Sequence, residues 1–292
     1  MSEGGYDLER LKTVGLGSIL DLALARVERV RRAGYSGDEA VRVLSETGKM
    51  LGAYRGRDLL KLRNMQPIPT GCRAIDRLLS GGVKPGLVTD FFGESGVGKS
   101  QLCFQLALKV ALASEAGGLG GYVAFMDTCG TFRPERLRGL ASAWGVDLGD
   151  ALARILVSKP RSVKAQTMIV DAVYQIEGLR LLLIDNLTEN FLVEFGGDEG
   201  VMERQMLLGR HLHDLALLAL KKDIAVVVTN SVRFRAAPAG SRVESGGSIP
   251  SQYTHVRIEL LRVNRGFAAR RLHPPPIIEA SYGLSEAGVV DV

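Results

Sequence analysis

The sequence LVTDFFGESGVGKSQLCFQLAL, residues 87–108, decides the fold of this chain. It predicts a short apolar strand, a glycine-rich loop and an amphipathic helix, and the loop carries the Walker A pattern G-x-x-x-x-G-K-[ST]. Glycines let the backbone of such a loop come close to an anion, so that its N–H groups point at phosphate oxygens. The alternative is a glycine-rich turn without a ligand, but the whole pattern matches in the expected context. We therefore expect a nucleoside triphosphate here.

The parts of this loop have separate expected roles. Lys99 should reach the β- and γ-phosphates, and Ser100 should ligate Mg²⁺. The helix that opens at Lys99 adds the positive end of its dipole. The predicted nucleotide-binding residues of the loop are Gly93, Glu94, Ser95, Gly96, Val97, Gly98, Lys99, Ser100 and Gln101.

Composition limits the kind of protein that this can be. The chain has 292 residues, of which 46% are hydrophobic, enough for one large core and a small additional domain. No apolar run of about 18 residues is present, so we expect no membrane span. The first residues, MSEGGYDLER, lack the apolar core of a signal peptide. Cys72, Cys103 and Cys129 are widely spaced and fit a reducing cytosol, so we expect a cytoplasmic protein.

Charge is distributed unevenly along the chain, whose formal net charge is +5. Residues 233–271 contain eight arginines against Glu244 and Glu259, whereas residues 189–203 contain five acids and no base. A basic stretch is typical of surfaces that bind a polyanion, although most such runs are only solvated. Charge alone leaves nucleic acid as one alternative for the basic segment.

The chain divides into segments of different character. We predict a helical N-terminal domain at 1–52, a linker at 53–69 that ends in Pro-Ile-Pro, and a core at 70–292. The N-terminal domain should contain a helix from Ser18 to Ala33 and a second helix, Asp38 to Leu51, which Ser36 can cap. These two helices around a glycine-containing turn resemble half of a helix-hairpin-helix unit.

Strands alternate with helices in the core. The predicted strands are Leu87–Phe92, Tyr122–Met126, Ile155–Val157, Leu181–Ile184 and Ala225–Val228. The predicted helices are Gln101–Ala113, Pro134–Trp144, Val163–Gln175 and Met202–Leu220. Near-continuous apolar strands separated by helices favour an α/β fold with a mainly parallel sheet covered on both faces. Residues 255–262 and 267–272, around Asn264-Arg265-Gly266, predict an antiparallel hairpin that closes this sheet.

A second chemical element is Leu181-Leu182-Leu183-Ile184-Asp185. An apolar strand that ends in an aspartate is typical of a Walker B element, whose carboxylate holds the Mg²⁺ shell. An aspartate at a strand end is often only a turn former, but this one follows the glycine-rich loop at a suitable distance along the chain. Asp185 is therefore the second predicted metal residue, beside Ser100.

Three further stretches resemble archaeal RadA proteins, which are RecA-family recombinases. They are TGCRAIDRLLSGGVKPG before the glycine-rich loop, MDTCGTFRPERL at 126–137, and RQMLLGRHLHDLALLALKKDIAVVVTNSV at 204–232. The resemblance implies a RecA-like ATPase core, ATP as the nucleotide, a role in recombinational DNA repair, and nucleotide bound between neighbouring protomers. It also implies that Arg136 stacks on adenine and that the N-terminal domain is a truncated helix-hairpin-helix domain.

Three positions depart from this family pattern. Cys129 stands where the family has the glutamate that polarises the attacking water. Ser231 and Ser248 stand where it has a glutamine and a histidine that report the γ-phosphate to DNA. A neutral thiol cannot replace a carboxylate as a water-orienting acceptor. We therefore predict an ATP-binding protein with weak hydrolysis, in which no catalytic residue is certain.

The expected DNA-binding residues form a reduced set. In the first loop of the family, residues 191–205, only Arg204 remains among acidic neighbours, which should repel phosphate. The second loop, about 233–247, carries Arg233, Arg235 and Arg242, and a mobile surface loop is the alternative interpretation. DNA contact is expected, with single strands favoured over duplex, but not the full grip of a recombinase.

Assembly should be weakened as well. The linker element with which RadA proteins bind a neighbouring protomer is Phe-x-x-Ala, and its nearest equivalent here starts at Tyr54 and lacks the alanine. The family residues that cap ATP from a neighbour fall at His273 to Pro275. We therefore predict an accessory paralog that acts on a RadA-type recombinase, on related paralogs or on DNA, and forms weak or no filaments. The alternatives are an active strand-exchange ATPase and a P-loop ATPase with a non-DNA partner.

Overall fold

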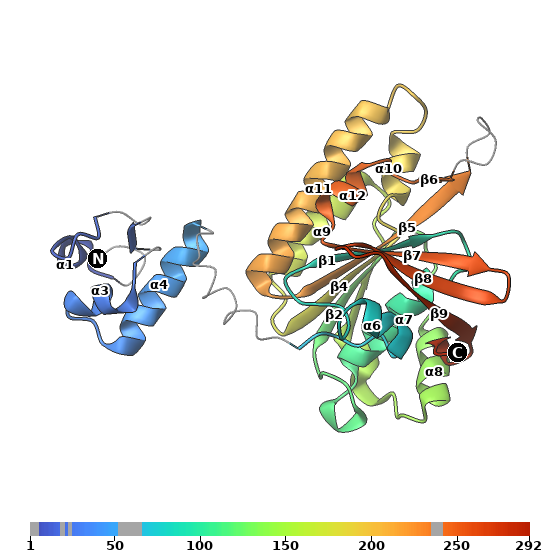
Figure 1. Ribbon diagram of the computed structural model, residues 1–292, viewed down its shortest axis with the longest axis horizontal. Helices are drawn as coiled ribbons and strands as arrows, with labels where there is room; N and C mark the ends of the chain where they lie inside the picture. Colours follow the sequence, from blue (N-terminus) through green and yellow to red (C-terminus); the bar gives the residue numbers. More distant parts are fainter. Residues whose placement is uncertain (1–5, 18–20, 23–24, 52–65, 235–241) are drawn as a thin grey trace. The chain divides into compact units, whose positions relative to one another are not determined.

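The computed structural model describes residues 6–17, 21–22, 25–51, 66–234 and 242–292. The chain divides into two compact units, Met1–Asn64 and Met65–Val292 (Figure 1). The boundary between them falls inside the segment predicted as a linker, most of which lies outside the described residues. In the described part of the chain, no helix is both long and apolar enough to span a bilayer.

The N-terminal unit is a small helical cluster. Its described helices are α1 (Leu8–Lys12), α3 (Val27–Arg32) and α4 (Gly37–Leu51). The predicted cap of α4 is confirmed, because Ser36 Oγ accepts from the Glu39 N–H at 3.2 Å and Glu39 returns a bond to the Ser36 N–H at 2.8 Å. This reciprocal pair is a capping box. The buried side chains of the unit are Leu11, Leu16, Leu22, Val30, Ala33, Ala40 and Val43.

The continuous helix expected from Ser18 to Ala33 is wrong. Ala25 and Arg26 are not helical, and Arg26 is the extended N-cap residue from which α3 starts. Leu22 and Val30 lie on either side of this break, and both are buried in the same small cluster. A straight helix would separate them by about 12 Å along its axis. The break lets both side chains reach one core.

The second unit contains one large sheet in the order β10-β9-β8-β7-β1-β5-β4-β2-β3, with β6 paired to β5. Its strands are β1 (Val88–Gly93), β2 (Tyr122–Asp127), β3 (Ile155–Ser158), β4 (Leu179–Asp185), β5 (Ala225–Phe234), β6 (Arg242–Glu244), β7 (Val256–Val263), β8 (Gly266–His273), β9 (Ile278–Ser285) and β10 (Gly288–Val290). The six strands from β7 to β3 in this order run parallel. The antiparallel β7–β8 hairpin is confirmed, and β9 and β10 extend it beyond what the sequence predicted.

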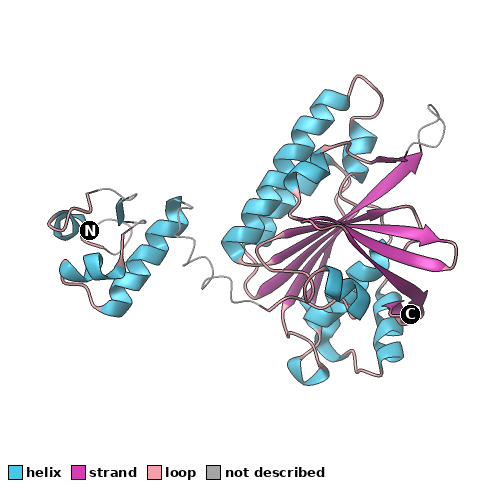
Figure 2. Cartoon of the chain, in the orientation of Figure 1, coloured by secondary structure: helices cyan, strands magenta, loops and turns pink. Residues whose placement is uncertain are grey.

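Helices cover both faces of this sheet, which confirms the predicted α/β class (Figure 2). One face is covered by α6 (Arg73–Leu78), α7 (Lys99–Ala111) and α8 (Pro134–Trp144), and the other by α9 (Val163–Tyr174), α10 (Glu189–Glu194), α11 (Val201–Lys222) and α12 (Ile249–Tyr253). Each face has its own apolar core. The sheet therefore separates two buried layers of different composition.

Strand register brings the predicted chemical residues to one edge. Gly93, at the end of β1, lies opposite Ser231 on β5, and Asp127 at the end of β2 lies opposite Asp185 on β4. The carboxyl ends of parallel strands meet at the same side of the sheet. Ligands of open α/β sheets bind outside these ends, so the site is expected where β1, β4 and β5 end.

Candidate nucleotide-binding site

The glycine-rich loop joins β1 to α7 through backbone conformations that suit glycine. Gly93, Gly96 and Gly98 have φ values of 155°, 77° and 100°. A Cβ on Gly93 would lie 2.2 Å from the carbonyl oxygen of Leu260, so the loop and β7 approach too closely for any side chain there. The pattern glycines are therefore required by the backbone path as well as by an anion.

Side chains of strand β9 contact this loop and support its position. The Tyr282 hydroxyl on β9 donates to the carbonyl of Val97 at 2.6 Å, and Val97 is fully buried. A Cβ on Gly98 would lie 2.8 Å from the Leu284 side chain, so β9 packs tightly against the start of α7. The position of the loop depends on strands more than 180 residues further along the chain.

Lys99 points back over the loop. Its Nζ donates to the carbonyls of Gly93 at 2.8 Å and Glu94 at 2.6 Å. Burial lowers the pKa of Lys99, and the nearby carboxylate of Asp185 acts in the opposite direction. These loop carbonyls are weak partners for an ammonium group compared with phosphate oxygens. The lysine is therefore held above the loop, where an incoming phosphate can take over its hydrogen bonds.

The residues fit a nucleotide with Mg²⁺. Gly98 opens the α7 helix in the left-handed conformation without any side-chain cap, which leaves the first N–H groups of the helix for an anion. Asp185 is buried at the end of β4, and its Oδ1 accepts a bond from Thr229 Oγ1. Within the described part of the chain no group of three metal-ligating side chains occurs. Ser100 at the start of α7 and Asp185 would hold Mg²⁺ together with phosphate oxygens and water.

The predicted adenine contact lies at the outer side of α7. Arg136 Nε on α8 donates to Gln101 Oε1 at 2.6 Å, and its Nη1 donates to the carbonyl of Glu286 at 2.8 Å. The structure thus brings together Gln101 and Arg136, two residues that the sequence assigned to nucleotide binding separately. The guanidinium plane is fixed from two sides and can stack on a flat ring.

Residues 61–292 match the Rad51 family. The chain belongs to that family. Its members are RecA-type ATPases of DNA recombination and repair, which bind DNA and form filaments or oligomers. The matched residues include the whole described core and begin at the predicted linker. The departures from the family pattern can therefore be placed on this structure.

Cys129 lies in the turn after β2, at the edge where β4 ends. Its Sγ lies 3.8 Å from Thr128 Oγ1, and Thr128 in turn bonds the backbone N–H and carbonyl of Asn186. Cys129 is exposed, but neighbouring protein atoms partly desolvate its thiol and raise its pKa, and the carboxylates of Glu189 and Asp185 raise it further. The side chain at this Rad51-family position is thus a neutral thiol near physiological pH.

Asp127, two residues before Cys129, is a carboxylate with a structural role. Its two oxygens accept from the backbone N–H groups of Thr131 and Phe132, each at 2.9 Å. Lys159 lies 3.9 Å from the same carboxylate. Because its hydrogen bonds stabilise the turn, Asp127 cannot act as a substitute base without opening it.

A cluster of polar side chains that the sequence did not predict connects Ser231 to the segment after the second loop. Ser231 Oγ accepts from Asn186 Nδ2 at 2.9 Å. Asn186 Oδ1 accepts from the N–H of Thr188, whose hydroxyl donates to Asn230 Oδ1 at 3.0 Å. Asn230 Nδ2 then donates to the carbonyl of Ser245 at 2.7 Å. These bonds connect the end of β4 to the backbone just after the 235–241 segment.

The cluster continues into a buried ion network of three strands. Asn230 Nδ2 also donates to Glu244, and Glu244 pairs with Arg257 on β7. Arg257 lies 3.3 Å from Asp90 in the middle of β1. Burial and the neighbouring Glu244 carboxylate raise the pKa of Asp90, and the Arg257 guanidinium acts in the opposite direction. The signal was present in the sequence, since a charged residue inside a buried strand requires a partner.

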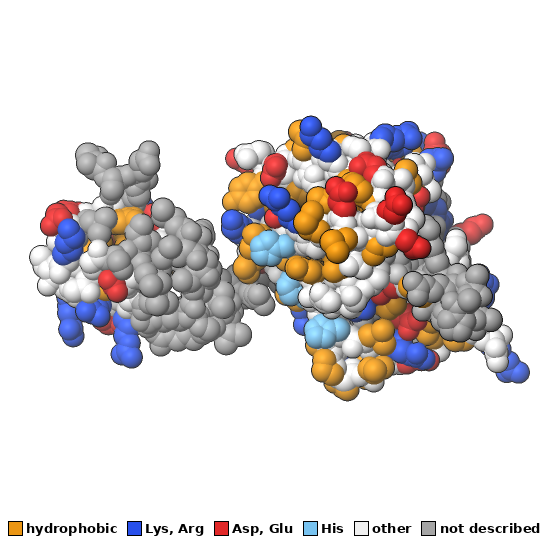
Figure 3. Space-filling model, turned by 90° about the horizontal axis from the view of Figure 1, so that it is seen from above, with side chains coloured by type: hydrophobic (Ala, Val, Ile, Leu, Met, Phe, Trp, Pro, Cys, Tyr) orange, Lys and Arg blue, Asp and Glu red, His pale blue; other side chains and the backbone are white. Residues whose placement is uncertain are grey.

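The other predicted residues are brought together only in part. Arg204, near the start of α11, donates to the carbonyl of Phe195 and so closes the acidic first loop. Arg233 and Arg242 lie on the paired strands β5 and β6 that border the second loop. Arg235 and Tyr54 lie outside the described residues. Seen from above, basic and acidic side chains are interspersed on the core unit (Figure 3).

Ser248 has become part of a short helix. It is the N-cap residue of α12, and its carbonyl accepts from Ser251 Oγ at 2.7 Å. Its own hydroxyl accepts from Gln252 at 3.4 Å. These contacts are local to α12, and none of them links Ser248 to Ser231.

Proposed function

We propose that this Rad51-family protein is an ATP-binding accessory paralog of homologous recombination, with slow hydrolysis, that acts on a RadA-type recombinase or on DNA. Cys129 carries this proposal. The lysine, serine, aspartate and arginine of a nucleotide site are present, but the water-orienting position holds a thiol whose pKa is raised. ATP would then serve mainly as a long-lived structural ligand.

The same residues suggest how binding is kept while turnover is lost. Bound Mg²⁺ would neutralise phosphate charge and support transfer to water. Lys99 and the N–H groups of the loop bind and orient the phosphates, and none of these contacts depends on Cys129. A positioned carboxylate contributes roughly 10²–10⁴-fold to the rate of such a reaction. Its replacement therefore affects the rate much more than the affinity.

Cys129→Glu tests this directly. The carboxylate should increase ATP turnover by about tenfold or more, part of the 10²–10⁴-fold range of a positioned base, while the Kd for ATP changes little. Cys129→Gln is the matched control, because it has the same size without the charge. Turnover should be measured on full-length protein, with the Kd from calorimetry.

A native protein that hydrolyses ATP at an ordinary rate would contradict the proposal, especially if Cys129→Glu left that rate unchanged or lowered it. The base would then lie elsewhere, and Glu94→Gln, within the glycine-rich loop, would be the next variant to test. Equal stimulation by Cys129→Glu and Cys129→Gln would also contradict it, because charge would not be the cause.

We also propose that DNA contact, where it occurs, runs through the second loop. Arg204 is engaged with Phe195 in the first loop, whose side chains are mainly acidic. Binding should be salt-sensitive and independent of sequence, since arginines would face phosphates. Neutralising Arg233 and Arg235 should weaken binding and flatten its salt dependence. Long filaments on ATP and DNA should be scarce, which electron microscopy would test.

A P-loop ATPase with a protein partner is the second candidate. One observation favours it: Arg204, the single cation of residues 191–205, donates to the carbonyl of Phe195 within the same acidic loop. A protein that binds ATP but fails to bind single-stranded or duplex DNA at low salt would support this candidate. Unchanged DNA affinity after both second-loop arginines are neutralised would contradict the assignment of DNA contact to the second loop.

A further inference from the structure

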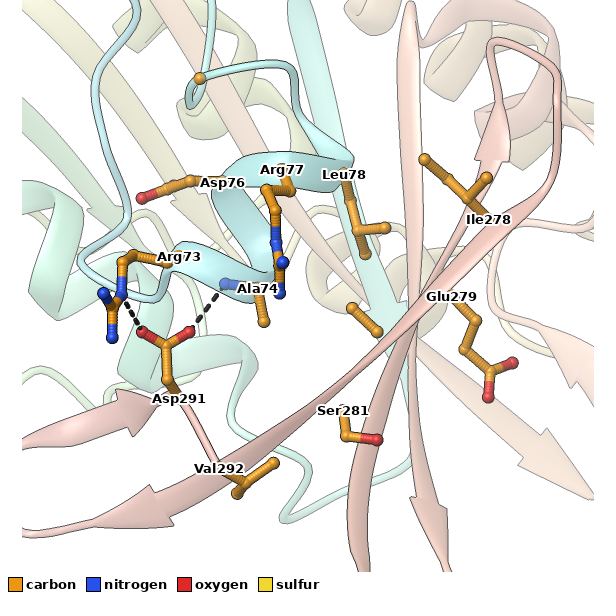
Figure 4. Close-up of a pocket in the computed structure, with 12 residues that line it drawn as sticks. Arg73, Ala74, Asp76, Arg77, Leu78, Ile278, Glu279, Ser281, Asp291 and Val292 are labelled. Atoms are coloured by element: carbon orange, nitrogen blue, oxygen red, sulfur yellow. Dashed lines mark hydrogen bonds and ion pairs between the residues drawn. The ribbon is translucent and has the colours of Figure 1, made fainter.

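A groove runs between α6 and β9 at the end of the sheet furthest from β3. It has a volume of about 950 Å³ and is open to solvent. Its lining includes Arg73, Asp76 and Arg77 on α6, residues 278–281 of β9, and Asp291 after β10 (Figure 4). None of these residues belongs to the nucleotide site described above.

One wall of the groove is an unpaired strand edge. Residues 278–282 of β9 pair with β8 on one side. On its other side, β9 pairs with β10 through Gly283, Leu284 and Ser285, which lie beyond the 278–282 stretch. Among the described residues no strand covers the outer edge of 278–282, and four consecutive residues of this stretch line the groove. Such an edge offers backbone N–H and C=O groups to an extended chain.

The chain itself shows how a strand and a carboxylate fit here. β10 lies antiparallel to β9 on this same edge, and Asp291 follows directly after it. The Asp291 carboxylate accepts from Arg73 Nε at 2.9 Å and from the N–H of Ala74 at 2.8 Å. An acidic side chain that continues an edge strand is thus already held by α6.

Arg77 offers a second position of this kind, one helical turn after Arg73 on α6. It is exposed and has no ion pair in the described part of the chain. The other acidic groups of the groove are engaged, since Asp76 accepts from Thr70 at 2.7 Å and Glu279 pairs with Arg270 at 2.8 Å. Charge complementarity therefore favours an acidic side chain beside Arg77.

We propose that this groove binds an extended acidic segment of a partner protein, which adds to β9 as an antiparallel strand in line with β10. A carboxylate of the segment pairs with Arg77, and apolar side chains alternate with it to cover Ile278 and Ala280. Backbone hydrogen bonds to 278–282 give affinity, and the arginine gives specificity. This inference goes beyond the proposed function and does not depend on nucleotide.

A phage-displayed library of random peptides, selected on the full-length protein, tests the proposal. The enriched peptides should alternate apolar and polar residues and carry Asp or Glu. Arg77→Glu should weaken their binding by at least about tenfold, as for a charge reversal at an interface, and replacing the peptide carboxylate by lysine should restore it. Hydrogen exchange on the native protein should show slower exchange at 278–282 when peptide binds.

Arg138→Glu on α8 is the control for the charge change, because Arg138 is also exposed, and it should leave affinity unchanged. Several results would overturn the proposal: no enrichment over an uncoated surface, equal affinity for native protein and Arg77→Glu, or protection confined to β3. A loss of peptide binding only when the protein self-associates would instead identify a second copy of this chain as the occupant.

Discussion

The face of the sheet covered by α7 buries mainly apolar groups, whereas the face under α11 also buries charged and amide groups. On the first face, the rings of Phe104, Phe125 and Phe132 lie with centroids 4.9–5.7 Å apart. On the second face, Asp90 and Arg257 form a buried ion pair within the sheet. The nucleotide loop is attached to the apolar face, and the segments that border the expected DNA loops are attached to the polar one.

This difference has a thermodynamic meaning. The free energy of apolar packing changes little with pH. Because the packed side chains fit closely, they keep α7 and the loop in one position. Buried polar groups are costly unless every partner is present, and their energy depends on protonation and geometry. The polar face is therefore the part of the core whose stability should respond to its surroundings.

The largest effect is expected from Arg257→Met. The change removes the cation between Asp90 and Glu244 and leaves two buried carboxylates, which should cost about 3–5 kcal/mol of unfolding free energy at neutral pH. Denaturant unfolding would measure it. Adding Asp90→Asn and Glu244→Gln should recover most of the loss, and lowering the pH should recover part. A loss that neither change reduces would show that packing on Phe92, and not charge, is the main contribution.

The pH dependence of the polar face should come next in size. Burial lowers the pKa of His211 to about 4, against about 6.5 in an unfolded chain. Between these values the unfolded chain binds a proton that the folded protein does not. The contribution is therefore fully present above pH 6.5 and is lost as the pH falls to 4, by about 3 kcal/mol in total.

His211→Gln should remove this dependence, because glutamine does not titrate and can still meet Gln166. The quantity to measure is the difference in unfolding free energy between variant and native protein at several pH values. Asp90 contributes with the opposite sign in both proteins, since its raised pKa favours the folded state at lower pH, so it cancels in the difference. A difference that stays constant from pH 7 to pH 4.5 would contradict the assignment.

Lys99→Ala should weaken ATP binding by about 10²-fold, the loss expected for a charge-assisted contact, and leave the unfolding free energy nearly unchanged. In the described residues its Nζ donates to the loop carbonyls of Gly93 and Glu94. Calorimetry and thermal unfolding would measure the two quantities. Lys109→Ala, near the end of the same helix, is the control. A protein with no affinity for ATP even in its native form would end the nucleotide assignment.

Phe104→Leu should have the smallest effect, about 1–2 kcal/mol, because it loses aromatic contacts but keeps an apolar group. The loss should be the same at pH 5 and pH 7.5, since apolar packing changes little with pH. Urea unfolding at both pH values would test this. A strong pH dependence of this variant would remove the distinction between the two faces.

The sequence predicted the apolar face well because its signals are local. The pattern of residues 87–108 identified β1, the loop and α7, and the apolar runs identified β2, β4 and β5. The β7–β8 hairpin was predicted from the short turn Asn264-Arg265-Gly266. Each of these signals lies within one element, so neighbouring residues were enough.

The remaining features depend on residues far apart in the sequence. The residues next to Arg257 in the sequence do not indicate that it pairs with Asp90, 167 residues away. The β9 sequence, IEASYGLS, mixes apolar and polar residues, and the contact of Tyr282 with the loop is apparent only in the structure. The expected Ser18–Ala33 helix failed because two buried positions had to meet in a small core. Site residues were predicted by motif, but their polar supports were not.

Gln105, on α7, accepts from the Val289 N–H at 2.7 Å and donates to the carbonyls of Val289 at 3.0 Å and Thr70 at 3.2 Å. One side chain therefore fastens both ends of the core to the helix that begins at the nucleotide loop. A pulling force applied between these ends would act first on Gln105 and on the three-residue strand β10, and through α7 on Lys99. If the glycine-rich loop binds nucleotide, its affinity should therefore be sensitive to mechanical tension between Thr70 and Val289.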